Sequence, residues 1–290
     1  MRLALIGTGL IGASAAWAMK KNAVVDAVSA FDLSEQSSRK AVEMGIADEA
    51  AATLQDCVCG AECVMVAVPV LAIAKVMEQI APFLGEHALV TDVGSVRSIV
   101  IEGTRKALGA KFANYAPVHP IAGGEMPGVE YADSGLFEGA KAISTPTEGM
   151  SGRAVEFWEK AWVAVGSKIL RMTPEEHDEV FASVSHLPHL LSYSMVDSIL
   201  HMGDPKRKLS LAGAGFRDFT RIAASSPAMW VDIFRANHDA VLTALSVFEQ
   251  NLAVLRRAVE DDDADLMRAI FERAAQERRR IAPHLPPKRS

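Results

Sequence analysis

Short apolar runs alternate with stretches of helical periodicity along the first 172 residues of the chain. The apolar runs have the length of buried strands and lie at residues 3–6, 24–31, 63–68, 88–92, 141–144 and 168–172. The helical stretches between them lie at residues 13–20, 70–83 and 96–108. Strands that alternate with helices predict a parallel sheet with helices on both faces, so we expect a doubly wound α/β fold.

The strand pattern stops near residue 173, and long amphipathic helical stretches follow. Turn residues break them at 203–205, 213–215 and 227, which leaves four or five helices. We therefore expect two domains, an α/β domain over residues 1–172 and an all-α domain over residues 173–290. The stretch 240–255 is apolar on more than one face, and a helix of that kind must be buried. Packing against a second copy would bury it, so we expect the helical domain to form a homodimer.

A glycine-rich loop follows the first apolar run. Gly7, Gly9 and Gly12 have G-x-G-x-x-G spacing, and Asp32 ends the second strand, twenty residues beyond the last glycine. Such glycines let the backbone approach a pyrophosphate at a helix N-terminus, and the acidic residue binds the adenosine ribose. This arrangement predicts a Rossmann-type dinucleotide-binding domain. The carboxylate of Asp32 would repel the extra phosphate of NADP, so we expect NAD as the cofactor.

Further residues near the carboxyl ends of the strands complete the predicted site, because ligands of a doubly wound sheet bind at this edge. The candidate cofactor contacts besides the glycines and Asp32 are Leu10, Ile11, Val68, Pro69, Asp92 and Gly94. His119 precedes Pro120, which places it at the end of an extended segment and at the same edge. Ser95 lies where a strand turns into a helix, so its hydroxyl could cap that helix.

Composition and charge exclude several classes of protein. The chain has 290 residues and 50% of them are hydrophobic, which is enough for two domains with a substantial core. Its formal net charge is −6 and its basic residues are scattered, so we expect no nucleic-acid surface. No apolar run reaches membrane-spanning length, and we expect a soluble cytoplasmic protein that binds no membrane. We interpret the three cysteines as reduced thiols and expect no metal site.

Four motifs follow the glycine loop in order: DVGSVR (92–97), HPIAGGE (119–125), SHLPH (185–189) and GFRDFTRIA (215–223), with PAMWVDI further downstream. Together they resemble the prephenate and arogenate dehydrogenase family of tyrosine biosynthesis, and the resemblance covers nearly the whole chain. It implies oxidative decarboxylation of prephenate to 4-hydroxyphenylpyruvate with reduction of NAD. The alternative within the family is an arogenate or dual-substrate cyclohexadienyl dehydrogenase that uses NAD or NADP.

The resemblance also implies roles for individual residues. His119 would accept the proton of the ring hydroxyl, and a neutral imidazole suits this near pH 7 because its ordinary pKa is about 6.5. Ser95 would form hydrogen bonds with this histidine and with the substrate hydroxyl. The other substrate contacts implied are Arg221 for a carboxylate, His189, the pocket aromatic Trp230, and the acidic gate residues Glu125 and Asp218.

Structural interpretations of the same residues stay open at this point. They are a strand-end cap for His119, an ion pair with Asp218 for Arg221, and a core position for Trp230. His186 and His189 could face one way as metal ligands, but no third ligand follows within the motif. Two rival functions fit the nucleotide fold. One is a β-hydroxyacid dehydrogenase, which usually presents a lysine acid/base in its helical domain, and the other is a catalytically silent NAD sensor.

Overall fold

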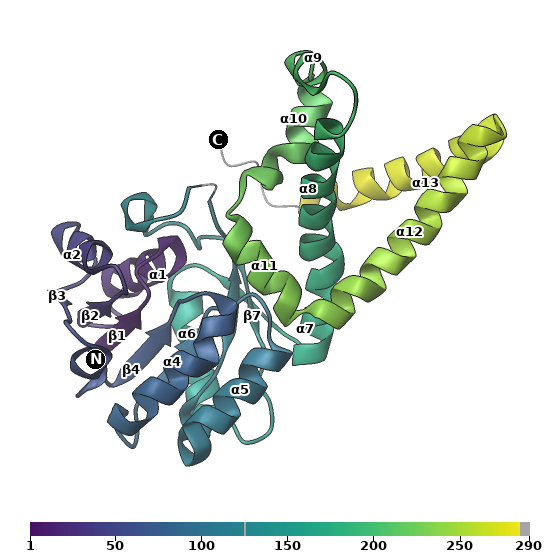
Figure 1. Cartoon of the computed structure of the whole chain (residues 1–290). Helices are drawn as coiled ribbons and strands as arrows, with labels where there is room; N and C mark the ends of the chain where they lie inside the picture. Colours follow the sequence, from purple (N-terminus) through teal and green to yellow (C-terminus); the bar gives the residue numbers. More distant parts are fainter. Residues whose placement is uncertain (125, 285–290) are drawn as a thin grey trace. The chain divides into compact units, whose positions relative to one another are not determined.

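The computed structural model describes residues 1–124 and 126–284 (Figure 1). The chain divides into two compact units, Met1–His238 and the residues from Asp239 onward. In the described ranges, no helix combines the length and the apolar character needed to cross a bilayer. The predicted domain boundary between residues 172 and 173 marks a change of structural class and does not coincide with the division into units, so it stays a prediction.

Five parallel strands form the main sheet, in the order β3-β2-β1-β4-β5. Their bounds are β1 (Arg2–Ile6), β2 (Ala27–Phe31), β3 (Glu49–Ala50), β4 (Cys63–Val66) and β5 (Leu89–Asp92). The predicted α/β fold is confirmed, and the predicted strands of this sheet match the observed ones to within a few residues at either end. Strand β3 has only two residues, which is too short for a hydrophobic pattern to indicate.

Helices cover both faces of this sheet. One core includes residues of α1 (Leu10–Lys21), α2 (Glu35–Glu43) and α6 (Gly152–Ala164). The other includes residues of α3 (Leu54–Val58), α4 (Ile73–Ile80) and α5 (Ser98–Leu108). Short 3-10 helices extend or link these elements at η1 (Val70–Ala72), η2 (Ala81–Phe83) and η3 (Gly109–Asn114).

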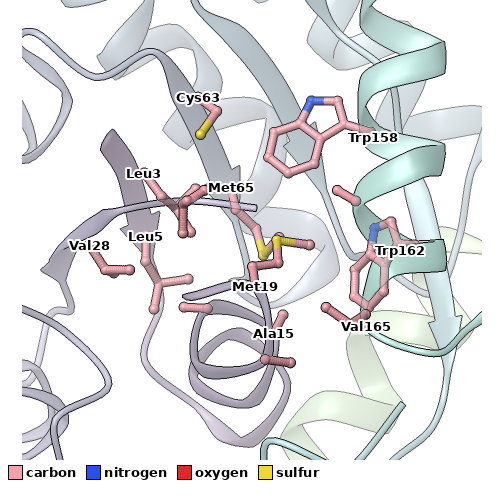
Figure 2. Packing of buried hydrophobic residues seen from close by; sticks show 14 of the residues in the cluster. Leu3, Leu5, Ala15, Met19, Val28, Cys63, Met65, Trp158, Trp162 and Val165 are labelled. Atoms are coloured by element: carbon pink, nitrogen blue, oxygen red, sulfur yellow. The ribbon is translucent and has the colours of Figure 1, made fainter. Parts of the chain in front are cut away.

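Two separate hydrophobic cores result because successive side chains of a strand point to opposite faces. In β1, Leu5 belongs to one core and Ile6 to the other, and both side chains are almost fully buried. The first core brings together Met19 of α1, Met65 of β4 and Trp162 of α6 (Figure 2). Full burial of one such side chain contributes about 1.5–3 kcal/mol, so these cores hold the sheet edge and its loops in place.

A second, smaller sheet follows, with β6 (Val118–Ile121), β7 (Lys141–Ser144) and β8 (Lys168–Arg171). Here the chain departs from the predicted parallel sheet, because β6 pairs with β7 in antiparallel orientation while β7 and β8 are parallel. Parallel pairing needs a crossover, usually a helix, and the described part of the connection from β6 to β7 contains only η4 (Val129–Tyr131). Just before β6, the Ala116 N–H donates to the Val90 carbonyl of β5, so the segment leading to His119 runs beside the main sheet.

Every element described after β8 is helical, as the fading strand pattern predicted. These elements are α7 (Pro174–Phe181), the π-helical turn η5 (Ala182–His186), α8 (Leu187–Leu200), α9 (Pro205–Ser210), α10 (Ala214–Thr220), η6 (Arg221–Ala224), α11 (Pro227–Ala236), α12 (His238–Glu260), α13 (Ala264–Ile281) and η7 (Ala282–His284). α7, η5 and α8 follow one another without a break (Figure 1). The π-type turn ends in the first two residues of the SHLPH motif, Ser185 and His186, and such turns are frequent at functional sites.

Candidate active site

Of the three glycines in the loop between β1 and α1, Gly9 alone has open space where a side chain would begin. A Cβ atom on Gly7, which has a φ of +96°, would lie 2.4 Å from the Ala67 carbonyl oxygen, and one on Gly12 would lie 2.3 Å from the Gly7 carbonyl oxygen. A Cβ on Gly9 would meet nothing within 4 Å. Gly9 is also the N-cap of α1 and offers no side-chain cap, so the first N–H groups of the helix remain available to an anion. The loop therefore fits a pyrophosphate.

Asp32 lies beside this loop at the end of β2. One carboxylate oxygen accepts hydrogen bonds from the Thr8 N–H at 2.8 Å and the Thr8 hydroxyl at 3.1 Å. The other accepts from the Ser34 N–H at 2.9 Å. These bonds orient the half-buried carboxylate next to the glycine loop, which is the position that the ribose contact requires. Arg39, which could offset its charge, is exposed and paired with Glu35.

Asp92 has a different setting from the one predicted. It is fully buried, and its carboxylate accepts hydrogen bonds from the Gly94 N–H at 2.7 Å, from the Arg97 guanidinium at 2.7 and 3.3 Å, and from the Tyr115 hydroxyl. Its side chain is therefore engaged inside the protein. Sequence reasoning missed Arg97 as its partner, although the five-residue spacing across a strand end was a usable signal. A cofactor contact of Asp92 or Gly94 stays a prediction.

Val68 lies close to the glycine loop, since a Cβ added to Gly7 would lie 3.2 Å from Cγ1 of Val68. Pro69 follows it and is exposed. The loop after β6 reaches the same region, because a Cβ on Gly124 would lie 3.2 Å from Cδ2 of Leu10. The segment that carries His119 thus ends against the start of α1, which places the HPIAGG motif and the nucleotide loop side by side.

His119 forms a hydrogen-bonded chain with two residues that the motifs did not include. Its Nδ1 lies 2.8 Å from Nε2 of His177, and Nδ1 of His177 lies 2.9 Å from Oδ1 of Asp178. Burial holds the pKa of His119 well below its usual value, and positive charge on His177, Arg97 and His186 would lower this pKa further. His119 is therefore neutral near pH 7 and able to accept a proton.

Asp178 also determines where α5 begins. Its carboxylate oxygens accept hydrogen bonds from the backbone N–H groups of Arg97 and Ser98, both at 2.8 Å, at the first turn of the helix. Ser95 was expected to be a candidate cap. The helix instead begins at Ser98, and its N-terminus is capped by Asp178 of α7. Ser95 instead lies partly exposed in the loop between β5 and α5. Its predicted contact with His119 stays a prediction.

His189 and Trp230 face each other across α8 and α11. Their rings stack with centroids 3.6 Å apart and planes at 22°. Nδ1 of His189 lies 2.8 Å from the Ser185 carbonyl oxygen, so this nitrogen carries the hydrogen and Nε2 is left as an acceptor. Trp230 is 5% exposed and belongs to the second core, as the structural interpretation of this residue expected. Its predicted role in lining the substrate pocket stays a prediction.

One ring nitrogen of His186 is engaged with Asn237. His186 is buried, and its Nδ1 lies 3.1 Å from Nδ2 of Asn237, which also donates to the Asp178 carbonyl oxygen at 2.8 Å. Burial lowers the pKa of His186 to about 4 and also lowers that of His189. Within the described ranges, no group of three histidine, cysteine, aspartate or glutamate side chains could hold a metal ion.

Arg221 begins η6 and is exposed. Its charge contributes to the lowered pKa of His189, after burial, which indicates that the two side chains lie in one region. Asp218 lies 3.4 Å from Nε of Arg217, so the neighbouring arginine is an ion partner of this aspartate. Glu125, predicted as a gate residue, lies outside the described residues. The predicted substrate roles of these residues stay predictions.

The fold and the site define a two-part class of dehydrogenase, with a Rossmann-type nucleotide fold joined to a helical region that carries histidines and arginines. Residues 15–171 match the family model described as prephenate dehydrogenase, nucleotide-binding domain, and residues 173–273 match that of prephenate dehydrogenase, dimerization domain. The chain belongs to the prephenate dehydrogenase family. The resemblance seen in the motifs is thereby confirmed.

Named relatives agree with this membership. The chain is 36% identical over 273 residues to a prephenate dehydrogenase of Bacillus subtilis, a match that covers 93% of this chain and 73% of the relative. It is 34% identical over 280 residues to a cyclohexadienyl dehydrogenase of Zymomonas mobilis, with 95% and 94% covered. Among solved structures, prephenate dehydrogenase of Aquifex aeolicus with hydroxyphenyl propionate and NAD⁺ is similar, with a TM-score of 0.88, 34% identity, and coverage of 96% and 97%.

Proposed function

We propose that this protein is an NAD-dependent prephenate dehydrogenase, which converts prephenate to 4-hydroxyphenylpyruvate and carbon dioxide in tyrosine biosynthesis. The observation that supports this most directly is the position of His119. It is a neutral imidazole anchored through Nδ1 to His177, on a segment whose following loop packs against Leu10 at the nucleotide loop. A proton acceptor beside a dinucleotide site is what the oxidation of a ring hydroxyl requires.

The residues at the glycine loop fit NAD. Gly9 leaves open space at the uncapped N-terminus of α1, and Asp32 presents a carboxylate oriented by Thr8 and Ser34. That carboxylate suits two ribose hydroxyls and disfavours a 2′-phosphate, which selects NAD over NADP. When bound, NAD supplies the hydride acceptor. The chain itself supplies the binding contacts, the alignment of the ring and the acceptor for the hydroxyl proton.

Proton transfer falls to His119. As the ring carbon gives up its hydride, the hydroxyl oxygen becomes a carbonyl and its proton must leave to an acceptor within hydrogen-bond reach. Once the ring carboxylate has left as carbon dioxide, the aromatised ring takes this proton back on the same oxygen to give the phenol. The lowered pKa of His119 keeps its imidazole neutral across the range around pH 7, so the acceptor is available before each turnover. Ser95, in the loop after β5, is the hydroxyl that aligns the substrate oxygen with this imidazole.

Substrate binding falls to Arg221 and His189. The planar guanidinium of Arg221 offers two donors that match a carboxylate, and His189 presents Nε2 from its stack on Trp230. Arg221 binds a carboxylate of the substrate, and the ring carboxylate leaves as neutral carbon dioxide. A group that binds the ground state and the transition state equally lowers KM without raising kcat, so the effect of Arg221 falls mainly on KM.

The test is an absorbance assay for NADH with the purified protein, run with prephenate and with arogenate and with both nucleotides. We expect turnover with prephenate and NAD, and kcat lower by about 10²–10⁴ in His119→Asn with little change in KM. Arg221→Ala should instead raise KM. Absence of NADH formation with all four combinations would identify a nucleotide-binding protein without this activity. Preference for arogenate would place the protein on the other branch of the family.

We also infer that the protein is a homodimer formed through its helical region. Residues 173–273 match a domain described as a dimerization domain. Many large apolar side chains of α12 and α13 are exposed, among them Leu242, Val247, Leu252, Val259, Leu266 and Phe271. Burying them between two copies would remove this apolar surface from water. In light scattering, Phe271→Asp should shift the mass toward the monomer, whereas Gln276→Asp, which adds the same charge at an exposed polar position of α13, should not.

A cytoplasmic location completes the proposal. It is supported by the thiols of Cys57, Cys59 and Cys63, which are all free of disulfides. Disulfides are rare in reducing compartments. Cell fractionation with a detector for the native protein tests this, and recovery in a membrane or secreted fraction would contradict it.

A further inference from the structure

The chain of hydrogen bonds behind His119 determines which of its nitrogens carries the hydrogen. It starts at Asp178, whose carboxylate can only accept. Although burial raises the pKa of Asp178, hydrogen bonds from His177, Ser98 and Arg97 lower it below the usual value, so the group is ionised near pH 7. The nitrogen of His177 that faces it, Nδ1 at 2.9 Å, must therefore carry a hydrogen.

The hydrogen bond between His177 and Asp178 determines which residue donates in the bond between His119 and His177. Burial lowers the pKa of His177, so this ring is neutral near pH 7 and holds one hydrogen. That hydrogen is on Nδ1, which leaves Nε2 of His177 as an acceptor. Nε2 lies 2.8 Å from Nδ1 of His119, so the hydrogen in this bond must come from His119. A neutral His119 with hydrogen on Nδ1 has an unprotonated Nε2.

We infer that Asp178 and His177 are positioning residues that hold His119 in its Nδ1–H form and so keep its Nε2 ready to accept the substrate proton. The importance of Nε2 rests on the proposed function, whereas the tautomer itself follows from the hydrogen bonds. When the hydroxyl proton arrives at Nε2, the imidazolium still donates through Nδ1 to His177, whose other nitrogen donates to the Asp178 carboxylate. The hydrogen bonds from His119 to His177 and from His177 to Asp178 keep their direction during this step.

The carboxylate of Asp178 is held in place by several hydrogen bonds. Asp178 lies on α7, whereas His119 lies on β6. The carboxylate oxygens of Asp178 are held by the first N–H groups of α5, and its carbonyl oxygen accepts from Asn237 at 2.8 Å. The positive end of the α5 dipole favours the carboxylate form. His177 is fully buried and packs against Phe181, with ring centroids 4.4 Å apart, so its ring cannot turn freely.

A purely structural role for Asp178, as the cap of α5, predicts different results from a positioning role. Replacing Asp178 by Asn puts an amide N–H₂ where one carboxylate oxygen was. If this group faces His177, it donates to Nδ1, which moves the hydrogen of His177 to Nε2 and forces His119 into the Nε2–H form. In serine proteases the corresponding substitution yields the wrong tautomer and lowers kcat by about 10⁴. A mere cap would alter stability and leave the tautomer of His119 unchanged.

The first measurement is ¹⁵N NMR of the histidine side chains in the full-length protein without substrate, with His119 assigned by comparison with His119→Asn. In the wild type we expect the signal of a protonated Nδ1 and an unprotonated Nε2. With its amide nitrogen toward His177, Asp178→Asn should reverse the two, and His177→Leu, which removes the acceptor, should give a mixture. His177→Gln can still offer an amide oxygen to Nδ1 and should retain the wild-type form. An Nε2–H form of His119 in the wild type would overturn the inference.

The second measurement is kinetic and uses the same variants. His177→Leu should lower kcat by about 10²–10⁴ with KM nearly unchanged, because an acid–base group loses its alignment while binding is kept. His177→Gln should recover most of this loss. His201→Gln serves as the matched control, since His201 is an exposed histidine beside Asp197 on α8 and should show wild-type kcat. Equal kcat in the Leu and Gln variants of His177 would contradict a positioning role.

The pH profile separates positioning from simple loss of structure. The charged or titratable groups that act on His119 are His177 of α7, His186 of η5 and Arg97 before α5, and Asp178 of α7 acts through its hydrogen bond with His177. In His177→Gln no protonated His177 can oppose the charging of His119 at low pH, so the acid limb of kcat/KM should move to higher pH. An unmoved limb would count against the inference. If the wild type fails to oxidise prephenate yet shows the Nδ1–H form, the proposed function fails while the tautomer assignment stands.

Discussion

His189 lies flat against Trp230, with ring centroids 3.6 Å apart and planes at 22°. This contact fixes one plane of the imidazole, and the bond from Nδ1 to the Ser185 carbonyl oxygen at 2.8 Å fixes its rotation. The direction of Nε2 of His189 is therefore fixed by the stack and by this one hydrogen bond. The stack places a core residue, Trp230, in direct support of His189, the residue that we propose contacts the substrate.

Substitutions of Trp230 test that relationship. Within the described ranges, Nε1 of Trp230 makes no hydrogen bond, so Trp230→Phe loses packing and no polar contact. We expect this variant to keep the stack, with wild-type KM for prephenate. Trp230→Ala should lower the free energy of unfolding by about 3–5 kcal/mol and raise KM, since the imidazole loses its support. Urea unfolding and steady-state kinetics measure the two effects, and an unchanged KM in Trp230→Ala would show that His189 does not depend on the stack.

The glycine loop allows a prediction that separates binding from stability. A Cβ at Gly9 meets nothing within 4 Å and the backbone there has a φ of −66°, so Gly9→Ala should leave the unfolding midpoint unchanged. It should weaken NAD binding at least about tenfold, because the methyl group would occupy the approach of the pyrophosphate. Gly12→Ala is the contrasting variant, since its Cβ would lie 2.3 Å from the Gly7 carbonyl oxygen and should destabilise the fold itself. Calorimetric titration with NAD and thermal unfolding of both variants would decide this, and equal loss of stability in both would contradict it.

The parts of the site that could be predicted from sequence are those whose determinants are adjacent in the chain. The glycine spacing, the strand before it and Asp32 after the next strand all belong to one short unit. His177 could not be found in this way, because its contact with His119 joins residues 58 apart in sequence. Ser95 was expected to be the candidate cap of α5 because a strand-to-helix junction was visible, but the cap comes from Asp178, about eighty residues further along the chain.

The pattern of apolar runs predicted the main sheet well for a similar reason, since each strand is bounded by its own turn residues. It could not reveal that β6 is antiparallel to β7, because the direction of pairing depends on the path of the connection. Burial of the Asp92 carboxylate was equally hidden. The position of Asp92 at the end of a strand indicates a ligand site. In the structure, Arg97 and the Tyr115 hydroxyl instead donate hydrogen bonds to its buried carboxylate.

Cofactor preference depends on the charge of Asp32. Asp32→Asn keeps the oxygen that accepts from the Thr8 N–H and removes the negative charge. We expect the ratio of kcat/KM for NADP to that for NAD to rise by at least about tenfold, mainly through a higher KM for NAD. Glu35→Gln, on the exposed first turn of α2, is the control for a nearby loss of charge. If the wild type already used NADP as well as NAD, Asp32 would not be the selecting residue.

The buried histidines should make the fold sensitive to acid. Burial lowers the pKa of His186 from 6.5 to about 4, and it lowers the pKa of His119, His177 and His189 in the same direction. In the unfolded chain each imidazole titrates near 6.5, so below that pH the unfolded state binds more protons than the folded state. The contribution to stability is therefore complete above pH 6.5 and falls as the pH decreases toward 4.

His186→Asn isolates one of these groups. The Asn amide oxygen can take the place of Nδ1 and accept from Asn237, so the variant removes the titration while it keeps the hydrogen bond. Between pH 7 and pH 5 the wild type should lose about 2 kcal/mol more unfolding free energy than this variant, because each pH unit below 6.5 costs about 1.4 kcal/mol for a group that stays neutral when folded. His201→Asn removes an exposed histidine and should behave as the wild type. Urea unfolding at the two pH values provides the comparison, and parallel losses in the wild type and His186→Asn would mean that His186 is not held neutral by its burial.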